Sequence, residues 1–205
     1  MDLRAAYQRV VDELAVNQPI DHAMNSLIDH CALDRPHESW SQFRSLPYAD
    51  MSALSGWLDE VFKSEPPSHD IRGLWFGLFN PIYDGEAVAD MYISGSTRFE
   101  PDDQSFDWAC DPEWRPETGY AHSEILRAIY RIANDESGLG NDAEYPLCLG
   151  YAAFVVRRLL VPADKSLWTN RTGSQIGVAV GFDSGDAVLL GRCSGDSIQS
   201  LLKRS

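Results

Sequence analysis

The sequence predicts an α+β fold in which an antiparallel sheet of at least four strands packs with helices and the N-terminal part is helical. Three observations predict it. The first 65 residues carry apolar side chains at helical spacing, two pairs of strand-like runs follow at 74–93 and 176–190, and an apolar helical stretch separates the two pairs. Because turn residues join the two runs of each pair, we expect two antiparallel hairpins with helices mostly on one side of the sheet.

Helical spacing indicates three helices before residue 66. The first apolar stripe, which has to end before Pro19, consists of Leu3, Ala6, Tyr7, Val10 and Leu14. A second helix is expected over residues 21–33. The third stripe starts at Met51 and stops at Pro66 and Pro67, because proline cannot continue a helix.

The first hairpin is predicted from two apolar runs and the turn between them. Residues 74–79 are apolar on both faces, and Ala89, Met91 and Ile93 alternate with more polar neighbours. The pair Asp84-Gly85 between the runs tolerates positive φ. The chain is therefore expected to return antiparallel at this turn.

The second hairpin is predicted from residues 176–182 and 187–190, with a turn at 183–186. The face opposite the large residues of its first strand carries only Gly177, Ala179 and Gly181, so a helix or loop can approach the backbone closely there. Between the hairpins we expect one helix with an isoleucine face around residues 125–132 and an apolar helix over 151–160.

No repeat or low-complexity tract divides the chain, so we expect a single domain over residues 1–205. The composition changes most clearly at Pro66 and Pro67. Residues 1–65 are accordingly expected to form a helical subdomain docked on residues 70–205.

The charge balance excludes some classes of partner. The chain has 31 acidic and 17 basic side chains, a formal charge of −14, so a nucleic acid would meet a repulsive field.

Neither a signal sequence nor an apolar run long enough to cross a membrane is visible. The four cysteines lack metal-binding or redox spacing. We therefore expect a cytoplasmic protein with reduced thiols, with no metal or cofactor, and without nucleic-acid or membrane partners.

The clearest anomaly is the segment from Tyr83 to Glu117, called here the acidic-aromatic segment, which has ten carboxylates against two arginines, a balance of −8. Aromatic residues interleave with these charges, so the segment is not a solvated acidic tail. Such a surface can attract a basic partner and bury apolar anchors. The partner-binding residues predicted on this basis are Asp102, Asp103, Asp107, Trp108, Asp111, Glu113 and Trp114. The alternative that stays open is a structural loop whose aromatics pack into the protein's own core.

Three kinds of chemistry can be considered for this chain: metal binding and carboxylate catalysis in the acidic-aromatic segment, and nucleophilic catalysis at Cys193. The aspartates offer oxygen ligands for calcium or magnesium but lack EF-hand spacing, and a catalytic carboxylate pair would need a cleft that sequence does not reveal. The run from Gly191 to Gly195 has the form of a nucleophile elbow around Cys193. In such hydrolases a histidine follows the nucleophile, whereas the last histidine here is His122. We therefore predict no catalytic residue and no metal ligand.

The sequence predicts an acidic α+β protein with an aromatic-carboxylate stretch and no assembled catalytic set. In this overall character, the chain resembles the immunity proteins of bacterial polymorphic-toxin and contact-dependent inhibition systems. The resemblance covers the whole chain loosely, and residues 92–114 are its most distinctive stretch. It implies a protein that binds a cognate toxin and blocks its active site. Nuclease toxins are usually basic because their substrate is polyanionic, so an inhibitor that resembles the substrate electrostatically would be acidic. The expected partner is a basic toxin domain, and a nuclease is one class that fits.

The second function that the sequence leaves open belongs to another class. It is a small enzyme or ligand-binding domain in which a carboxylate cluster holds a cation or a basic substrate. The carboxylates in question are Asp102, Asp103, Asp107 and Asp111.

Overall fold

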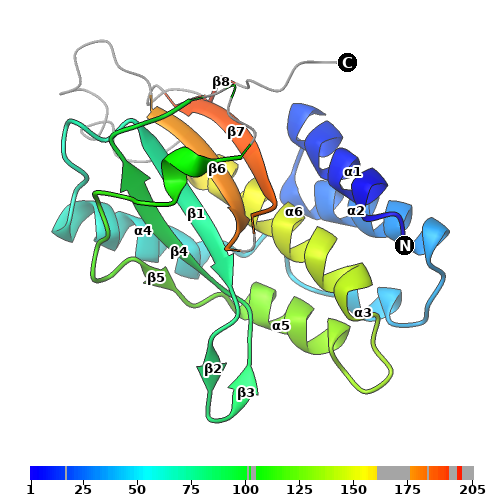
Figure 1. Cartoon of the computed structure of the whole chain (residues 1–205). Helices are drawn as coiled ribbons and strands as arrows, with labels where there is room; N and C mark the ends of the chain where they lie inside the picture. Colours follow the sequence, from blue (N-terminus) through cyan, green and yellow to red (C-terminus); the bar gives the residue numbers. More distant parts are fainter. Residues whose placement is uncertain are drawn as a thin grey trace.

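The computed structural model describes residues 1–16, 18–100, 102, 105–160, 176–183, 185–193 and 198–199. In these residues, helices cover one face of a sheet and a long loop crosses the other face (Figure 1). The helices in the described ranges are α1 (Leu3–Val16), α2 (Ile20–Asp34), α3 (Trp40–Arg44), α4 (Ser52–Ser64), α5 (Glu124–Ala133) and α6 (Asn141–Leu160). None of these helices is long and apolar enough to cross a membrane.

The three helices predicted before residue 66 are confirmed as α1, α2 and α4. The short helix α3 was not predicted, because its five residues are too few to show a periodic pattern. Helix α6 starts well before the expected residue 151, and it contains Pro146. Its buried face continues in that early part with Ala143 and Leu147, which explains why the helix extends there.

The strands are β1 (Gly73–Phe79), β2 (Ile82–Tyr83), β3 (Glu86–Ala87), β4 (Asp90–Ser96), β5 (Tyr120–Ala121), β6 (Ile176–Phe182), β7 (Ala187–Cys193) and β8 (Ile198–Gln199). A short 3-10 helix, η1 (Asp107–Ala109), lies between β4 and β5 in the chain. The main sheet has the order β5-β4-β1-β6-β7-β8, and β2 and β3 form a separate pair.

Both predicted hairpins are confirmed: β1 pairs antiparallel with β4, and β6 pairs antiparallel with β7. The two hairpins meet through a parallel pairing of β1 with β6, in which Gly73 lies opposite Gly177. This parallel pairing was not predicted. The sheet is still mostly antiparallel, and the α+β class is confirmed.

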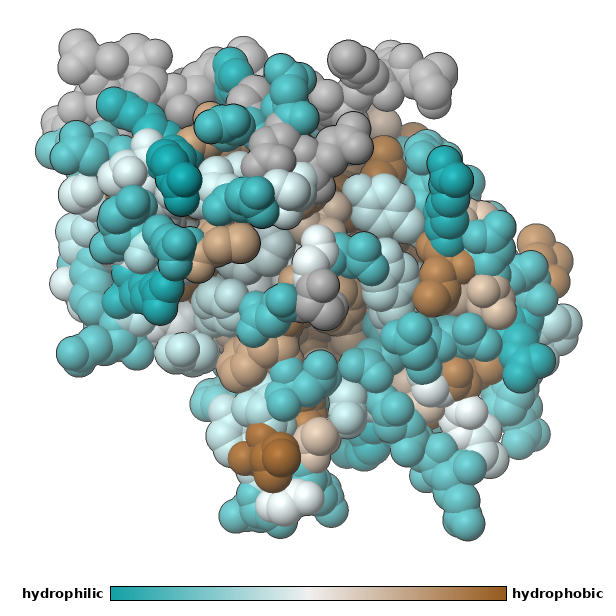
Figure 2. Space-filling view, in the orientation of Figure 1, coloured by the Kyte–Doolittle hydropathy of each residue, from teal (hydrophilic) through white to brown (hydrophobic). Residues whose placement is uncertain are grey.

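The β2–β3 hairpin projects from the body of the molecule (Figure 1). Its turn residues Asp84 and Gly85 have φ of +52° and +87°, as the sequence predicted for this pair. Ile82 is 72% exposed and Tyr83 is 42% exposed. Figure 2 shows hydrophobic surface at this projection, on a face that is otherwise largely hydrophilic.

The main core lies between the sheet and the helices. Helix α6 packs against β1, β6 and β7 on one side and against α1, α2 and α5 on its other sides. One continuous buried cluster includes Met24 and Leu27 of α2, Phe154 of α6, and Phe76 of β1. The N-terminal helices and the sheet therefore share this core, and the subdomain arrangement expected from the sequence stays a prediction.

The outer face of the sheet carries a second, smaller core. Residues of β1 and β6 that face outward include Gly73 and Gly177, and a Cβ atom at either position would collide with an aromatic ring. The ring over Gly177 is that of Phe99, and the ring over Gly73 is that of Trp108. The close approach expected on the small-residue face of β6 is therefore confirmed, and a loop makes it.

Candidate functional site

The part of the acidic-aromatic segment that follows β4, residues 97–117, crosses the outer face of the sheet and is called here the outer loop (Figure 1). Its short helix η1 contacts β1 and β4. Beyond η1, the Trp114 N–H donates to the Gly95 carbonyl at 3.0 Å, and the Gly95 N–H donates to the Trp114 carbonyl at 2.9 Å. The outer loop is thus joined to β4 at both of its ends.

Aromatic side chains hold the middle of the outer loop against the sheet. Trp108 is only 3% exposed. Phe99 meets Trp108 edge to face with ring centroids 5.3 Å apart, and Phe106 lies 6.0 Å from Trp75 of β1. Full burial of an aromatic side chain such as Trp108 stabilises the folded state by about 1.5–3 kcal/mol. The loop is therefore fixed by its own apolar residues.

Trp114 is half-buried at the far end of the outer loop. Its ring stacks on Phe62 of α4 with centroids 6.3 Å apart, and its indole N–H donates to the carbonyl of Glu65 at 2.9 Å. The structure thus places both predicted anchors, Trp108 and Trp114, within the fold. Their contribution to partner binding stays a prediction.

Glu65, the residue that follows α4, fastens the end of the outer loop. Its Oε1 accepts from the backbone N–H and the hydroxyl of Thr118 at 3.0 and 2.8 Å, and its Oε2 accepts from the N–H of Glu117 at 2.8 Å. The backbone N–H groups of Thr118 and Glu117, followed by the Thr118 hydroxyl, lower the pKa of Glu65. Sequence reasoning missed Glu65 because it lies 52 residues before Glu117.

Glu113 ties the end of the outer loop to its beginning. Its Oε2 accepts from the N–H of Thr97 at 2.8 Å, and this bond lowers the pKa of Glu113. This predicted partner-binding carboxylate therefore also has a structural contact.

The remaining predicted carboxylates that the structure describes lie on the surface. Asp102, Asp107 and Asp111 are exposed, whereas Asp103 lies outside the described residues. Within the described part of the chain, no three His, Cys, Asp or Glu side chains are grouped so that they could hold a metal ion. Cys193 ends β7, and residues 194–197 of the motif and its continuation lie outside the described residues.

An open cleft of about 520 Å³ lies beside the outer loop, between its last residues and the strands β4 and β5. Three aromatic rings from three strands form one wall. Phe79 of β1, Tyr92 of β4 and Tyr120 of β5 have centroids 5.7–6.0 Å apart. Tyr120 is 61% exposed, so this wall faces solvent. Sequence reasoning missed the cleft because no local pattern brings these three strands together.

The charged groups that line the cleft are Asp183, Glu117 and Arg115. Asp183 belongs to the turn between β6 and β7, and its Oδ1 accepts from the hydroxyl of Tyr92 at 2.7 Å. Burial, and then this hydrogen bond, raise the pKa of Tyr92. The phenol therefore stays protonated at neutral pH and holds the Asp183 carboxylate in place.

Ser94 is among the residues that line the cleft. It lies on the outer face of β4 opposite Trp75, and it is 3% exposed. Its hydroxyl oxygen is buried and has no hydrogen-bond partner among the described residues. A buried hydroxyl without a partner is costly, and such groups are often found where a ligand or water binds.

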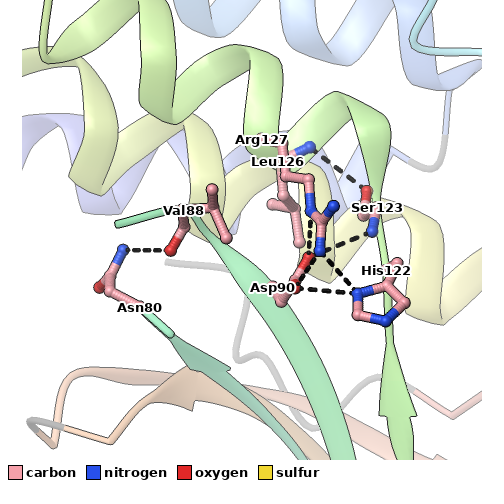
Figure 3. A network of polar contacts seen from close by, with 7 residues as sticks. All are labelled: Asn80, Val88, Asp90, His122, Ser123, Leu126 and Arg127. Carbon is pink, nitrogen blue, oxygen red and sulfur yellow. Dashed lines mark hydrogen bonds and ion pairs between the residues drawn. The ribbon is translucent and has the colours of Figure 1, made fainter. Parts of the chain in front are cut away.

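A second polar network joins β4 to the start of α5 (Figure 3). Asp90, 1% exposed, accepts from Arg127 Nε at 3.0 Å and Nη2 at 2.7 Å, and lies 3.1 Å from His122 Nδ1. The Ser123 N–H also points to Asp90 at 3.4 Å. The Arg127 guanidinium lies over the ring of Tyr83, 5.1 Å from its centroid. The network therefore connects the projecting hairpin to the start of α5.

This network could not be read from the sequence. Asp90 is one carboxylate among ten in its segment, and Arg127 lies 37 residues away. His122 is exposed, and the adjacent Ser123 caps α5 by accepting from the Leu126 N–H. Hydrogen bonding to Asp90 raises the pKa of Arg127.

Comparison of the chain with protein families, with curated proteins and with solved structures found no match.

Proposed function

We propose that the chain is an acidic binding protein of the immunity type, which neutralises a basic toxin domain by covering its active site. The observation that carries this proposal is the construction of the outer loop. Trp108 is buried against the sheet with Phe99 and Phe106 packed beside it, while Asp102, Asp107 and Asp111 are exposed. Asp107 and Asp111, within and just after η1, thus sit on a fixed support.

A fixed support matters because association costs free energy whenever a loop has to be ordered on binding. The outer loop is already held by Trp108, by the Glu113 contact to Thr97 and by Glu65 at its far end. Little of the interaction energy is then spent on ordering. The formal charge of −14 extends the attraction beyond the contact surface and steers a basic partner toward it.

A toxin that acts on nucleic acid fits this surface, because its active site has to attract a polyanion. A row of exposed carboxylates can occupy the place of phosphate groups there. The cytoplasm is the compartment in which such an inhibitor would meet a nuclease, and we include that compartment in the proposal.

The test begins with capture of the partner from a lysate of the producing organism on the immobilised protein, followed by purification of the captured protein. Its association rate is then measured at rising salt. Because the Debye length falls from about 30 Å at 0.01 M to about 8 Å at physiological ionic strength, we expect the association rate to drop about tenfold.

The variant for this experiment is the triple substitution Asp102→Asn, Asp107→Asn and Asp111→Asn. It should slow association by about three- to tenfold and change the dissociation rate little, because exposed charges act mainly on arrival. The matched control removes three exposed carboxylates elsewhere, through Asp59→Asn, Glu60→Gln and Glu136→Gln. Equal effects of the two triple variants would remove the outer loop from the interface.

A functional readout completes the test. Expression of the captured partner alone in a heterologous host should stop growth, and co-expression of the protein should restore it. Growth that is unaffected by the partner, or not restored by the protein, would contradict the immunity function.

A further inference from the structure

The cleft beside the outer loop combines three features of a binding site. It has an aromatic wall, two carboxylates and a buried hydroxyl without a partner among the described residues. We propose that this cleft binds the guanidinium group of an arginine side chain. The inference rests on the proposed function in one respect, because it takes the arginine to be an anchor residue of the basic partner.

The aromatic wall supplies the first step of the argument. A cation within about 6 Å of a ring centroid is attracted by the electron density of the ring face, and guanidinium also stacks on aromatic planes. Tyr120 is the most exposed of the three rings, at 61%. Its contacts with Phe79 and Tyr92, at 5.7 and 6.0 Å, hold the ring in position.

The carboxylates supply the second step. The cleft is lined by Asp183 and Glu117 against a single arginine, Arg115, so its ionic groups carry a net charge of −1. The Tyr92 hydroxyl at 2.7 Å orients the Asp183 carboxylate through Oδ1. A carboxylate can accept about four hydrogen bonds, so Asp183 keeps the capacity to receive a guanidinium fork.

The hydroxyl of Ser94 supplies the third step and favours arginine over lysine. Ser94 is 3% exposed, and its oxygen has no hydrogen-bond partner within the described ranges. Guanidinium has five N–H donors spread over a plane, so it can serve a carboxylate and a hydroxyl while its face lies on a ring. An ammonium group is a point charge that cannot stack in this way.

The experiment uses the full chain labelled with 15N and three small probes, followed by NMR titration. The probes are N-acetyl-arginine amide, its neutral isostere N-acetyl-citrulline amide, and N-acetyl-glutamate amide. We expect the arginine probe to shift the amide signals of Ser94, Tyr120 and Asp183 with a dissociation constant of about 1–10 mM, and the citrulline probe to bind about tenfold more weakly.

The variant Asp183→Asn keeps an oxygen that can accept from Tyr92 but removes the negative charge. It should weaken binding of the arginine probe by about fivefold or more, because a charge-assisted hydrogen bond is replaced by a neutral one. Asp186→Asn is the matched control, since Asp186 is exposed and lies in the same turn without lining the cleft. It should leave the affinity within about twofold.

Equal affinity for the arginine and citrulline probes would overturn the inference, as would tighter binding of the glutamate probe, which would identify Arg115 as the binding group. Shifts confined to residues outside the cleft would overturn it as well. Failure here is distinguishable from failure of the proposed function. If a basic partner binds the wild type and Asp183→Asn equally well, only the cleft assignment fails. If the arginine probe binds as expected and no basic partner is captured, the cleft assignment is supported and the immunity function fails.

Discussion

Asp90 shows how much one buried carboxylate can organise in this protein. It accepts hydrogen bonds from Arg127 and the Ser123 backbone and contacts His122, and it thereby joins the start of β4 to the start of α5. Arg127 in turn lies over Tyr83, next to the turn of the projecting hairpin. The position of that hairpin therefore depends on a single side chain that has almost no contact with solvent.

The substitution Asp90→Asn tests this dependence. It keeps the shape of the side chain but removes the charge that faces Arg127, and it directs an N–H₂ group at donors. We expect the free energy of unfolding to fall by about 2–4 kcal/mol, because one partner of a largely buried ion pair is lost. Urea unfolding measures this change. Glu86→Gln, an exposed carboxylate on the hairpin, is the control and should cost less than about 0.5 kcal/mol; a similar small loss for Asp90→Asn would show that the network is not stabilising.

The cysteines provide a second test at the scale of single residues. Cys31 and Cys148 are buried, and burial raises the pKa of each thiol, to about 12 for Cys31. Cys110 is exposed on the outer loop. Since the thiolate is the reactive form, brief treatment of the native protein with iodoacetamide should modify Cys110 and leave Cys31 and Cys148 unmodified.

Peptide mapping by mass spectrometry measures the modified fraction at each of these thiols. Unfolding in urea before the reagent is added provides the control, because all three thiols should then react. Early modification of Cys148 in the native protein would contradict its burial in α6.

At the scale of elements, the connection between α4 and the outer loop depends on the ionisation of Glu65. Its carboxylate accepts from Thr118 and Glu117, and its carbonyl accepts from Trp114. The folded state therefore favours the ionised carboxyl, which is why the pKa of Glu65 lies below its ordinary value. The helix and the loop are held together by a group that acid can neutralise.

This linkage predicts a pH dependence. Because the pKa of Glu65 is lower in the folded state, the stabilisation is fully present above the unfolded pKa of about 4.3 and is lost as the pH falls through the folded pKa. The free energy of unfolding should thus decline between about pH 5 and pH 3 more steeply for the wild type than for Glu65→Gln. Chemical unfolding at a series of pH values measures both slopes. Parallel curves for the two proteins would show that Glu65 does not contribute.

The hairpins could be predicted because their signals are local. Asp84-Gly85 and the turn at residues 183–186 each join two apolar runs, and the structure confirms both pairings. The parallel pairing of β1 with β6 could not be predicted, because it depends on packing against α6 and leaves no mark in either strand. Gly177 and Gly181 did indicate a close approach, but not that Phe99 of a distant loop would make it.

The candidate site was less predictable than the hairpins, because most of its contacts join residues that are far apart in the sequence. The run of carboxylates in the outer loop is visible in the sequence, and Asp102, Asp107 and Asp111 are exposed. Whether an interleaved aromatic faces solvent or the sheet depends on what lies beneath it, so the sequence left open whether Trp108 is a partner anchor or packs into the protein's own core. The cleft residues Ser94 and Asp183 come from separate hairpins and meet only in the folded chain.

At the scale of the whole molecule, the sheet separates two cores of unequal size. The larger core lies against the helices, and the smaller one contains Trp75, Trp108, Ala179 and Ala187 beneath the outer loop. Strands β1 and β6 contribute to both cores. Loss of either core should therefore disturb the same pair of strands, and unfolding should be cooperative.

Hydrogen exchange measured by mass spectrometry tests this cooperativity. Peptides from α1 and α2 share a buried cluster with the sheet, so their slowest amides should exchange with the same free energy of opening as those of β1, within about 1 kcal/mol. Exchange of α1 and α2 at a free energy several kcal/mol lower would instead identify residues 1–65 as a separate subdomain.

The attachment of the outer loop also determines how this protein can associate with another chain. The edge of β4 that faces away from β1 pairs with Tyr120 and Ala121 of β5. The Ile93 N–H on this edge donates to the Gly119 carbonyl, and Gly95 exchanges two hydrogen bonds with Trp114. Its backbone groups are therefore already used, and an incoming strand finds no template there. A partner on this side has to bind through side chains, so substitutions at exposed loop positions can alter the choice of partner while this edge of β4 remains closed to an added strand.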